Sequence, residues 1–254
     1  MAEFPAYAVL GAGRWAKRIH NILSGEQRRV LMVVGARPLP AESDSTFKAR
    51  LTATLQAGGT RCAWLCVPPG PHVALLVQAA LEADLHVIVE KPWYGSIEDT
   101  RRLQTLARKK QRLLAVDFEY LTLEEVENWR KCFYPGAKLR FGGHFFVSRS
   151  DRSGIPAIDN LGSHLLAIRE YAVPSSTISE MQCSYERPDE RLVWIERKGR
   201  RLSTIELVTH GQIAIQRFIE KVEAALDGAA FPFDLDFALR VARQIDAYKT
   251  CVSA

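Results

Sequence analysis

The succession of short apolar runs and helix-like segments in the first half of the chain constrains its fold most strongly. Apolar runs predict strands at residues 7–10, 30–36, 62–67, 86–90 and 113–118, and helical spacing predicts helices at 14–23, 47–55, 71–83 and 97–109. Strands that alternate with helices form βαβ units, so this half predicts a doubly wound parallel sheet. The run at 30–36 contains no polar side chain, which predicts a strand buried on both faces of that sheet.

The pattern changes near residue 120. Helices are predicted at residues 123–132 and 212–226, a loop leading into a helix at 155–171, and neighbouring antiparallel strands at 138–147, 178–185, 192–197 and 203–208. We therefore predict an α/β protein of two domains. Residues 1–120 contain the parallel sheet, and residues 121–254 form a smaller α+β domain with a largely antiparallel sheet, whose C-terminal helix could pack back on the first domain.

Composition and charge exclude several classes of protein. Of the 254 residues, 47% are hydrophobic and 25% charged, as in ordinary globular proteins and unlike disordered or collagen-like chains. The net charge of +5 includes no block of like charges, so we expect no nucleic-acid partner. The five cysteines form no paired C-x-x-C motif, and no apolar run approaches the ~18 residues of a membrane span. We expect a cytoplasmic protein with reduced thiols, no metal site and no membrane segment.

A glycine-rich turn directly follows the first apolar run. The sequence GAGRWA at residues 11–16 matches G-x-G-x-x-G/A between a predicted strand and a predicted helix, the context of a dinucleotide-binding turn. The first glycine permits a tight turn, and the second lets backbone N–H groups approach a pyrophosphate at the positive end of the helix. The alternative is an ordinary glycine turn. In the first interpretation the coenzyme contacts Gly11, Ala12, Gly13, Arg14 and Trp15.

The end of the second apolar run bears on the choice of coenzyme. NAD sites usually place Asp or Glu there to bind the ribose hydroxyls, whereas this run ends in Gly35, Ala36 and Arg37. An arginine can form a charge-assisted pair with the 2′-phosphate that distinguishes NADP. We therefore predict NADP(H) in preference to NAD(H). The alternative is a solvated Arg37, with Glu42 or Asp44 folded back on it.

Two further segments carry a family resemblance. The sequences WLCVPPGPH at residues 64–72 and HVIVEKP at 86–92, together with the glycine turn, resemble the Gfo/Idh/MocA oxidoreductases, which include glucose-fructose oxidoreductase and inositol dehydrogenase. The resemblance covers residues 6–120, and 233–254 resemble the family's C-terminal helix. It implies an N-terminal Rossmann domain and a C-terminal α+β domain that closes the substrate site and often forms the oligomer contact. Further coenzyme contacts are implied for Cys66, Val67, Pro68, His72, Glu90 and Lys91.

Lys91 is the residue on which the predicted chemistry depends first. In the family this lysine lies beside the nicotinamide and helps to transfer or stabilise the proton that accompanies the hydride. A positioned ammonium can neutralise the negative charge that a hydride leaves on a carbonyl oxygen, and ligands of open α/β sheets bind at the carboxyl ends of strands. Glu90 and Pro92 are expected to shape the turn, with Pro92 in cis. Without this context, a lone lysine would be a solvated surface charge.

A second motif, IDNLGSHLL at residues 158–166, resembles the family's D-I/L-G-x-H helix start. Asn160 and His164 are four residues apart, so both can point at the substrate from one helical face. Asn160 stands where the family has aspartate, and Asp159 is turned about 100° away around a helix. An asparagine orients a hydroxyl but accepts no proton. We predict catalytic roles for Asn160 and His164; the alternatives are a helix N-cap and a core histidine.

Weaker candidates lie nearby. Glu119 and Tyr120 end the fifth apolar run, and Tyr120 is predicted to contact the substrate. Trp15 and Trp93 could line the nicotinamide pocket or simply pack. The remaining histidines are interpreted as structural or surface groups: His20, His86, His144 and His210.

The favoured hypothesis is an NADP(H)-dependent oxidoreductase that moves a hydride between nicotinamide and a small carbonyl, alcohol or imine. The substrate would be sugar-like, or an imine or thiazoline of a biosynthetic pathway. About 130 residues remain for the second domain, fewer than the family usually has. The alternative is therefore a catalytically weak NADP(H)-binding sensor or partner subunit. We also expect a homodimer formed through the C-terminal sheet.

Overall fold

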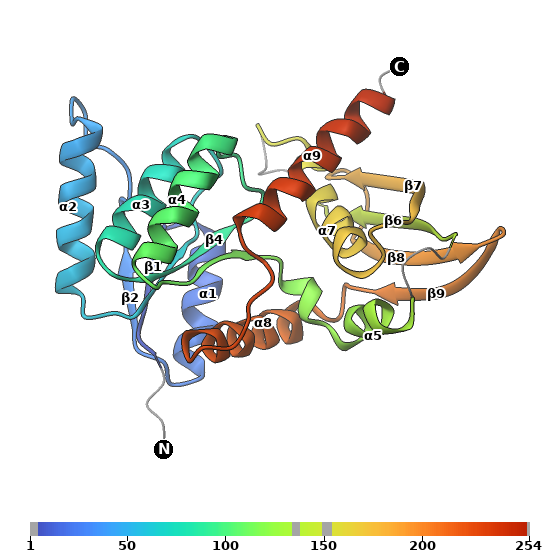
Figure 1. Ribbon diagram of the computed structural model, residues 1–254, viewed down its shortest axis with the longest axis horizontal. Helices are drawn as coiled ribbons and strands as arrows, with labels where there is room; N and C mark the ends of the chain where they lie inside the picture. Colours follow the sequence, from blue (N-terminus) through green and yellow to red (C-terminus); the bar gives the residue numbers. More distant parts are fainter. Residues whose placement is uncertain (1–4, 134–137, 149–153, 253–254) are drawn as a thin grey trace. The chain divides into compact units, whose positions relative to one another are not determined.

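The computed structural model describes residues 5–133, 138–148 and 154–252, and these form two compact units. Unit 1 comprises the described residues up to Asp117 together with Val222–Leu239. Unit 2 comprises Phe118–Lys221 and the residues from Arg240 onward. The chain therefore passes from one unit to the other three times, as the colours of Figure 1 allow the reader to follow.

Unit 1 is built on a five-stranded parallel sheet in the order β2-β1-β3-β4-β5. The strands are β1 (Tyr7–Leu10), β2 (Val30–Val33), β3 (Cys62–Leu65), β4 (His86–Glu90) and β5 (Leu114–Asp117). The helices between them are α1 (Arg14–Gly25), α2 (Asp44–Ala57), α3 (His72–Glu82) and α4 (Ile97–Lys109), and α3 and α4 lie side by side in Figure 1. The predicted doubly wound parallel sheet is confirmed. Every side chain of β1 and β3 is buried, because both strands lie inside the sheet.

The prediction for β2 was wrong in length and in burial. The strand ends at Val33, and only this residue of the four is buried. Val34, which the apolar run had included, is 68% exposed. The physical reason is the position of β2 at the edge of the sheet, where one side has no neighbouring strand to cover it.

A returning segment of the chain completes unit 1. It contains the end of α8 (Gly211–Leu226) and the start of α9 (Leu235–Val252). The carboxylate of Glu223 accepts two hydrogen bonds from the Arg28 guanidinium, at 2.6 and 2.8 Å, and one from the Tyr7 hydroxyl at 3.0 Å. The carbonyl of Phe233 accepts a hydrogen bond of 2.7 Å from the N–H of Val116 in β5. Residues more than a hundred positions apart thus form one folded body.

Unit 2 contains a four-stranded sheet in the order β7-β6-β8-β9, which Figure 1 shows from top to bottom. The strands are β6 (Arg140–Phe146), β7 (Thr177–Ser184), β8 (Glu190–Arg197) and β9 (Arg200–Glu206). The other elements are the 3₁₀ helix η1 (Glu119–Thr122), α5 (Glu124–Cys132), α6 (Ala157–Asn160) and α7 (Gly162–Ala172). The pairs β6–β8 and β8–β9 are antiparallel, which confirms a largely antiparallel sheet.

The pairing of β6 with β7 corrects the prediction of antiparallel neighbours throughout. These two strands are parallel, and β6 lies between β7 and β8. Helices α6 and α7 connect β6 to β7, and a connection of this length permits a parallel crossover. The short turn after β7 joins it to a strand with which it does not pair.

The two faces of β6 have different surroundings. The Phe145 ring stacks on the His164 ring of α7, with centroids 5.0 Å apart, so alternate residues such as His144 and Phe146 point away from that helix. We call this second side the outer face. There the Arg187 and Arg201 guanidiniums lie over the rings of Phe146 and Trp194, at 3.9 and 4.2 Å from the ring centroids. His144 contacts carboxylate oxygens of Glu180 and Glu190 at 3.1 and 3.2 Å on the same face.

Candidate functional site: the strand ends of unit 1 and the helix α7 motif of unit 2

The glycine turn has the geometry that a pyrophosphate requires. Gly11 has a φ of +137°, and a Cβ at this position would overlap the carbonyl oxygen of Cys66 at the end of β3. Gly13 is the N-cap of α1, and a Cβ on it would meet no atom within 4 Å. Because glycine offers no capping side chain, the first N–H groups of α1 keep their capacity to bind an anion. Ala16 is fully buried, so the small third residue of the motif serves helix packing.

The end of β3 lies beside this turn. The N–H of Cys66 donates a 2.9 Å hydrogen bond to the carbonyl of Leu10, and the Cys66 side chain is 8% exposed. Burial raises the pKa of the Cys66 thiol well above its usual range. Val67 is partly exposed, Pro68 is exposed, and His72 begins α3. The structure therefore brings the predicted residues of the Pro-Pro loop to the same sheet edge as the glycine turn.

Glu90, at the end of β4, is surrounded by donors from two other elements. Its Oε1 atom accepts hydrogen bonds from the indole N–H of Trp15 in α1 and from that of Trp64 in β3, the latter at 2.9 Å. The Cys66 sulfur lies 4.0 Å from the same oxygen. Burial raises the pKa of Glu90, while these two indoles and the Lys91 ammonium act in the opposite direction. Trp15 and Glu90, both predicted to contact the coenzyme, thus contact each other.

Lys91 directly follows β4 and is partly buried. Its peptide bond to Pro92 is cis, as predicted. Trp93 is 4% exposed, and its indole N–H donates a 2.9 Å hydrogen bond to Thr100, which favours packing over coenzyme contact for this residue. The cis turn therefore fixes the direction in which the chain leaves the strand at Lys91.

Arg37 is exposed beyond the end of β2. Glu42, which could have folded back on it, binds the Arg50 guanidinium instead, at 2.8 and 2.9 Å. The Arg50 hydrogen bonds, followed by one from the N–H of Leu39, lower the pKa of Glu42 to about 2. The other acidic neighbour, Asp44, begins α2. Glu42 therefore forms its ion pair with Arg50 and not with Arg37.

In unit 2, His164 contacts residues from two other elements, η1 and β6. Its Nδ1 atom is 3.8 Å from Oε2 of Glu119, and its ring meets the Tyr120 ring edge to face, with centroids 5.0 Å apart. Glu119, Tyr120 and His164 are each at most 6% exposed. The Tyr120 hydroxyl accepts a 2.8 Å hydrogen bond from Arg191 of β8. The weak candidate Glu119 thus supplies the histidine with the carboxylate that position 160 lacks.

Asn160 and Asp159 have separate partners. Asn160 ends α6 and does not cap α7, whose N-cap is Leu161, so the predicted single helical face is divided between two short helices. The Asn160 amide donates a 3.0 Å hydrogen bond to the Tyr185 hydroxyl. Asp159 forms an ion pair with Lys249 of α9. The displaced aspartate therefore binds a cation of its own rather than His164.

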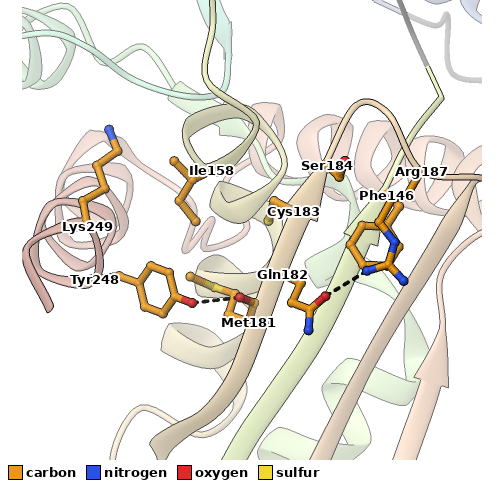
Figure 2. Close-up of a pocket in the computed structure, with 9 residues that line it drawn as sticks. All are labelled: Phe146, Ile158, Met181, Gln182, Cys183, Ser184, Arg187, Tyr248 and Lys249. Atoms are coloured by element: carbon orange, nitrogen blue, oxygen red, sulfur yellow. Dashed lines mark hydrogen bonds between the residues drawn. The ribbon is translucent and has the colours of Figure 1, made fainter. Parts of the chain in front are cut away.

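Figure 2 shows a pocket of about 440 Å³ in unit 2, between the edge strand β7, the start of α6 and the end of α9. The Tyr248 hydroxyl donates a 2.8 Å hydrogen bond to the Met181 carbonyl inside it, and Arg187 donates to Gln182 at 2.9 Å. None of the predicted substrate residues, Tyr120, Asn160 and His164, lines this pocket. Over the described residues, no group of three or more His, Cys, Asp or Glu side chains is placed to hold a metal ion.

The remaining histidines have their own surroundings in the described part of the chain. His86 is 8% exposed and its Nδ1 atom accepts a 2.9 Å hydrogen bond from the N–H of Leu113. His210 lies 3.5 Å from Glu125, and the His20 ring contacts its neighbour Asn21.

No helix in the described ranges combines the length and the apolarity that are required to cross a membrane.

Two residues near Glu90, Asp117 and Trp64, were not singled out by the sequence analysis. Asp117 is fully buried at the end of β5, and strand register places it opposite Glu90 of β4. Trp64 lies in the middle of an apolar run and gives no polar signal in the sequence. The signal for Asp117 was present: an acidic residue interrupts an otherwise apolar strand, at the same sheet edge as the Glu-Lys-Pro turn.

Comparison with known proteins agrees with this geometry. The family model for Gfo/Idh/MocA, described as an oxidoreductase family with an NAD-binding Rossmann fold, matches residues 6–118. Residues 6–118, less than half of the chain, are thus similar to the Gfo/Idh/MocA oxidoreductases. A dTDP-3,4-didehydro-2,6-dideoxy-alpha-D-glucose 3-reductase from Saccharopolyspora spinosa is 32% identical over 115 residues, which is 42% of this chain and 33% of that protein. An uncharacterised oxidoreductase of Schizosaccharomyces pombe is 28% identical over 48% of this chain and 37% of its own length.

The chain thus spans about a third of the length of these curated relatives. Solved structures resemble it over most of its length at low identity. GenD2 from gentamicin A biosynthesis, in complex with NAD, has a TM-score of 0.78 and 15% identity over 99% of this chain and 95% of its own. The UDP-N-acetylglucosamine 3-dehydrogenase GnnA from Acidithiobacillus ferrooxidans has a TM-score of 0.74 and 13% identity over 95% of both chains. At such identity these two structures show a shared fold alone.

Proposed function

We propose that this protein is an NAD(P)(H)-dependent oxidoreductase acting on a sugar-like small molecule. The main support is the sheet edge of unit 1, where the glycine turn, the end of β3 and the Glu90–Lys91 turn follow adjacent strands. Ligands of open α/β sheets bind at this edge. The similar protein from Saccharopolyspora spinosa is named as a reductase of a nucleotide-linked sugar, and the structurally similar GnnA as a dehydrogenase of another, which supports a sugar-like substrate here.

The residues of unit 1 fit a dinucleotide. The N–H groups at the start of α1 would bind the pyrophosphate, and the space beside Gly13 admits it. Cys66, Val67, Pro68 and His72 would form the wall along the nicotinamide half. When bound, the coenzyme supplies the hydride or accepts it. Arg37, exposed and not engaged by Glu42, would bind a 2′-phosphate, so we propose NADP(H) as the preferred coenzyme.

Lys91 would handle the proton that accompanies the hydride. As a carbonyl is reduced, negative charge develops on its oxygen, and an ammonium beside it can donate the proton that neutralises this charge. In the reverse direction, the neutral amine accepts the hydroxyl proton. Reduction of an imine makes the same demand at nitrogen, so Lys91 serves either type of substrate.

We propose roles toward the substrate for three residues of unit 2 as well. His164 has a carboxylate partner in Glu119, which would stabilise its imidazolium form and fix the ring orientation. Asn160, held by Tyr185, can donate or accept a hydrogen bond but cannot take up a proton. We propose that His164 acts on the proton and that Asn160 and Tyr120 position the substrate.

A coenzyme titration followed by a variant tests this function. NADPH and NADH are titrated into the protein while tryptophan fluorescence is recorded, since Trp15 and Trp64 lie beside the proposed site. Turnover is then measured on nucleotide-linked sugars and on imines. We expect Lys91→Met to bind NADPH as the native protein does and to lose at least 100-fold in kcat, within the usual range for a lost proton-transfer group.

Two outcomes would contradict the proposal. If neither coenzyme changes the fluorescence, the glycine turn is not a dinucleotide site. If NADPH binds but no substrate class is turned over, the protein is the catalytically weak sensor or partner subunit that is the alternative hypothesis. Lys110→Met is the matched control, because Lys110 binds Asp84 at 2.9 Å and takes no part in the proposed chemistry.

We also propose self-association through the outer face of the second sheet. Its aromatic side chains, Phe146 and Trp194, are each 1% exposed beneath arginines of the same chain, so the contact surface is polar. Polar contacts weaken as salt screens them. Light scattering is expected to show a dimer that dissociates as salt rises and is weakened by Arg201→Glu but not by Arg102→Glu on α4. A monomer at every salt concentration would reject it.

A further inference from the structure

The carboxyl groups of Glu90 and Asp117 form a pair at the ends of β4 and β5. The two residues are direct partners in the parallel register of these strands. Asp117 is fully buried, so strand register places its carboxyl group beside that of Glu90 inside the protein. Two ionised carboxylates at neighbouring buried positions repel each other and lose their hydration, and a proton on one of them removes both costs. The arrangement therefore favours a pair that holds one proton and carries one negative charge.

The surroundings of this pair favour a single negative charge. Trp15 from α1 and Trp64 from β3 donate to Glu90 Oε1, which stabilises one ionised carboxylate. A second charge in the same buried place would meet like-charge repulsion and a desolvation cost. The pKa of Glu90 is raised by burial, in agreement with this argument. Cys66, directly after β3, adds no charge, because burial raises the pKa of its thiol and keeps it protonated.

Lys91 directly follows Glu90 in the turn after β4, and its ammonium acts to lower the pKa of Glu90. We propose that Glu90 and Asp117 share one proton at neutral pH and, as a singly charged pair, hold Lys91 in its ammonium form. Both are positioning residues, since they act through Lys91. This assignment rests on the proposed function, and it adds which direction of the reaction, reduction or oxidation of the substrate, the site favours.

The direction follows from the charge of Lys91. With the lysine protonated, a hydride added to the carbonyl carbon converts C=O to C–H and C–O⁻, and the ammonium N–H bond breaks as its proton joins the oxygen. A reduced nicotinamide, when bound, would supply this hydride and be oxidised, and Lys91 would regain a proton from solvent. The pair keeps its single charge throughout. The site is therefore set for reduction of its substrate rather than for oxidation.

Infrared spectroscopy tests the shared proton without any substrate. In deuterated buffer near neutral pH, a protonated carboxyl gives a C=O stretching band apart from those of carboxylates and amides. We expect this band in the native protein and its loss in both Asp117→Asn and Glu90→Gln. Each variant replaces a carboxyl by an amide of the same shape, so each keeps the size of the side chain and leaves one carboxylate with its single charge. Absence of the band from the native protein, or its persistence in both variants, would overturn the proposal.

The pH dependence of reduction tests the action on Lys91. Each single variant keeps one negative charge, so we expect the basic limb of kcat/KM to stay where it is. The double variant removes the charge, and we expect the limb to move by about one to two units to lower pH, as for a cation that loses an adjacent anion. An unchanged limb in the double variant would refute the role of the pair. Circular dichroism confirms that each variant is folded, and Asp99→Asn on α4 is the matched control.

These readouts separate the failure of this inference from the failure of the proposed function. If the native protein shows the carboxyl band, both variants lose it and no substrate is turned over, the inference of a shared proton stands and the proposed oxidoreductase function is rejected. If turnover depends on Lys91 but the native protein shows no carboxyl band, the proposed function stands and the inference of a shared proton is rejected.

Discussion

Arg37 is the residue on which coenzyme choice depends in this protein. We expect Arg37→Ser to lower the ratio of NADPH to NADH affinity by about 10- to 100-fold, because a charge-assisted hydrogen bond contributes about 1.5–3 kcal/mol. NADH affinity should hardly change. Titration of both coenzymes by fluorescence measures the ratio, and Arg102→Ser, an exposed arginine bound to Asp99, is the matched control. Equal ratios in the native and Arg37→Ser proteins would remove Arg37 from the site.

Glu119 is the residue that would keep His164 in its working form. We expect Glu119→Gln to lower kcat by about 10- to 100-fold with little change in coenzyme affinity, since the carboxylate acts through the imidazole. Steady-state kinetics with the reduced coenzyme measure the effect. Glu124→Gln, at an exposed position of α5, should behave as the native protein. If Glu119→Gln were fully active, His164 would have no need of this carboxylate.

His86 makes the stability of unit 1 sensitive to acid. Burial, with smaller effects from Arg112 and Arg61, lowers its pKa from 6.5 to about 4. The unfolded chain therefore binds more protons than the folded chain in this interval, so stability is complete above pH 6.5 and falls as the pH drops toward 4. We expect a loss of about 1–2 kcal/mol, after allowance for solvent screening.

His86→Asn provides the test of this acid sensitivity. Asparagine can accept the hydrogen bond from Leu113 but does not titrate. We expect its urea midpoint to fall less between pH 7 and pH 4.5 than that of the native protein. Parallel curves for the two proteins would contradict the assignment.

At the level of helices and strands, local pattern predicted most of the fold. The central strands and all four helices between them follow from apolar periodicity, because burial between two helical layers demands it. The predictions that were wrong concern features that depend on neighbouring strands distant in sequence. An edge strand such as β2 has the same apolar composition as a central one, and the parallel pairing of β6 with β7 depends on where the crossover places the strand.

The candidate site divides in the same way. The glycine turn and Lys91 are local motifs and could be found from their spacing. The partnership of Glu90 with Asp117 depends on strand register, and that of His164 with Glu119 depends on packing between η1 and α7. Register and packing are set by the whole fold, so neither pair could be predicted from a single sequence.

The contact between α8 and the first strand is expected to contribute strongly to stability. Arg28 is 8% exposed, and Glu223→Gln would leave its guanidinium without the principal anion and would place an amide NH₂ group against one of its N–H donors. We expect Glu223→Gln to lower the free energy of unfolding by about 2–3 kcal/mol, somewhat less than for a fully buried pair. Urea denaturation measures it, and Glu220→Gln, on an exposed position of α8, is the control.

At the level of the whole molecule, unit 1 does not end where its last strand ends. A chain truncated after residue 120 lacks Glu223, the Phe233 carbonyl that binds Val116, and the fully buried Phe233 ring. We expect it to lose cooperative thermal unfolding, which circular dichroism can follow. Joining residues 222–239 to it through a flexible linker should restore the transition. A cooperative transition at the native Tm in the truncated chain would show that the returning segment is dispensable.

The three passages of the chain between its units also limit how such a protein can be recombined. Exchange at one junction would give a chimera in which β1–β5 come from one parent while Glu223 and Phe233 come from the other. The pairs Arg28–Glu223 and Val116–Phe233 would then have to match across parents. Transplanting the coenzyme half intact requires two segments to be moved together, so relatives that exchange substrate specificity by single crossovers should preserve both of these contacts.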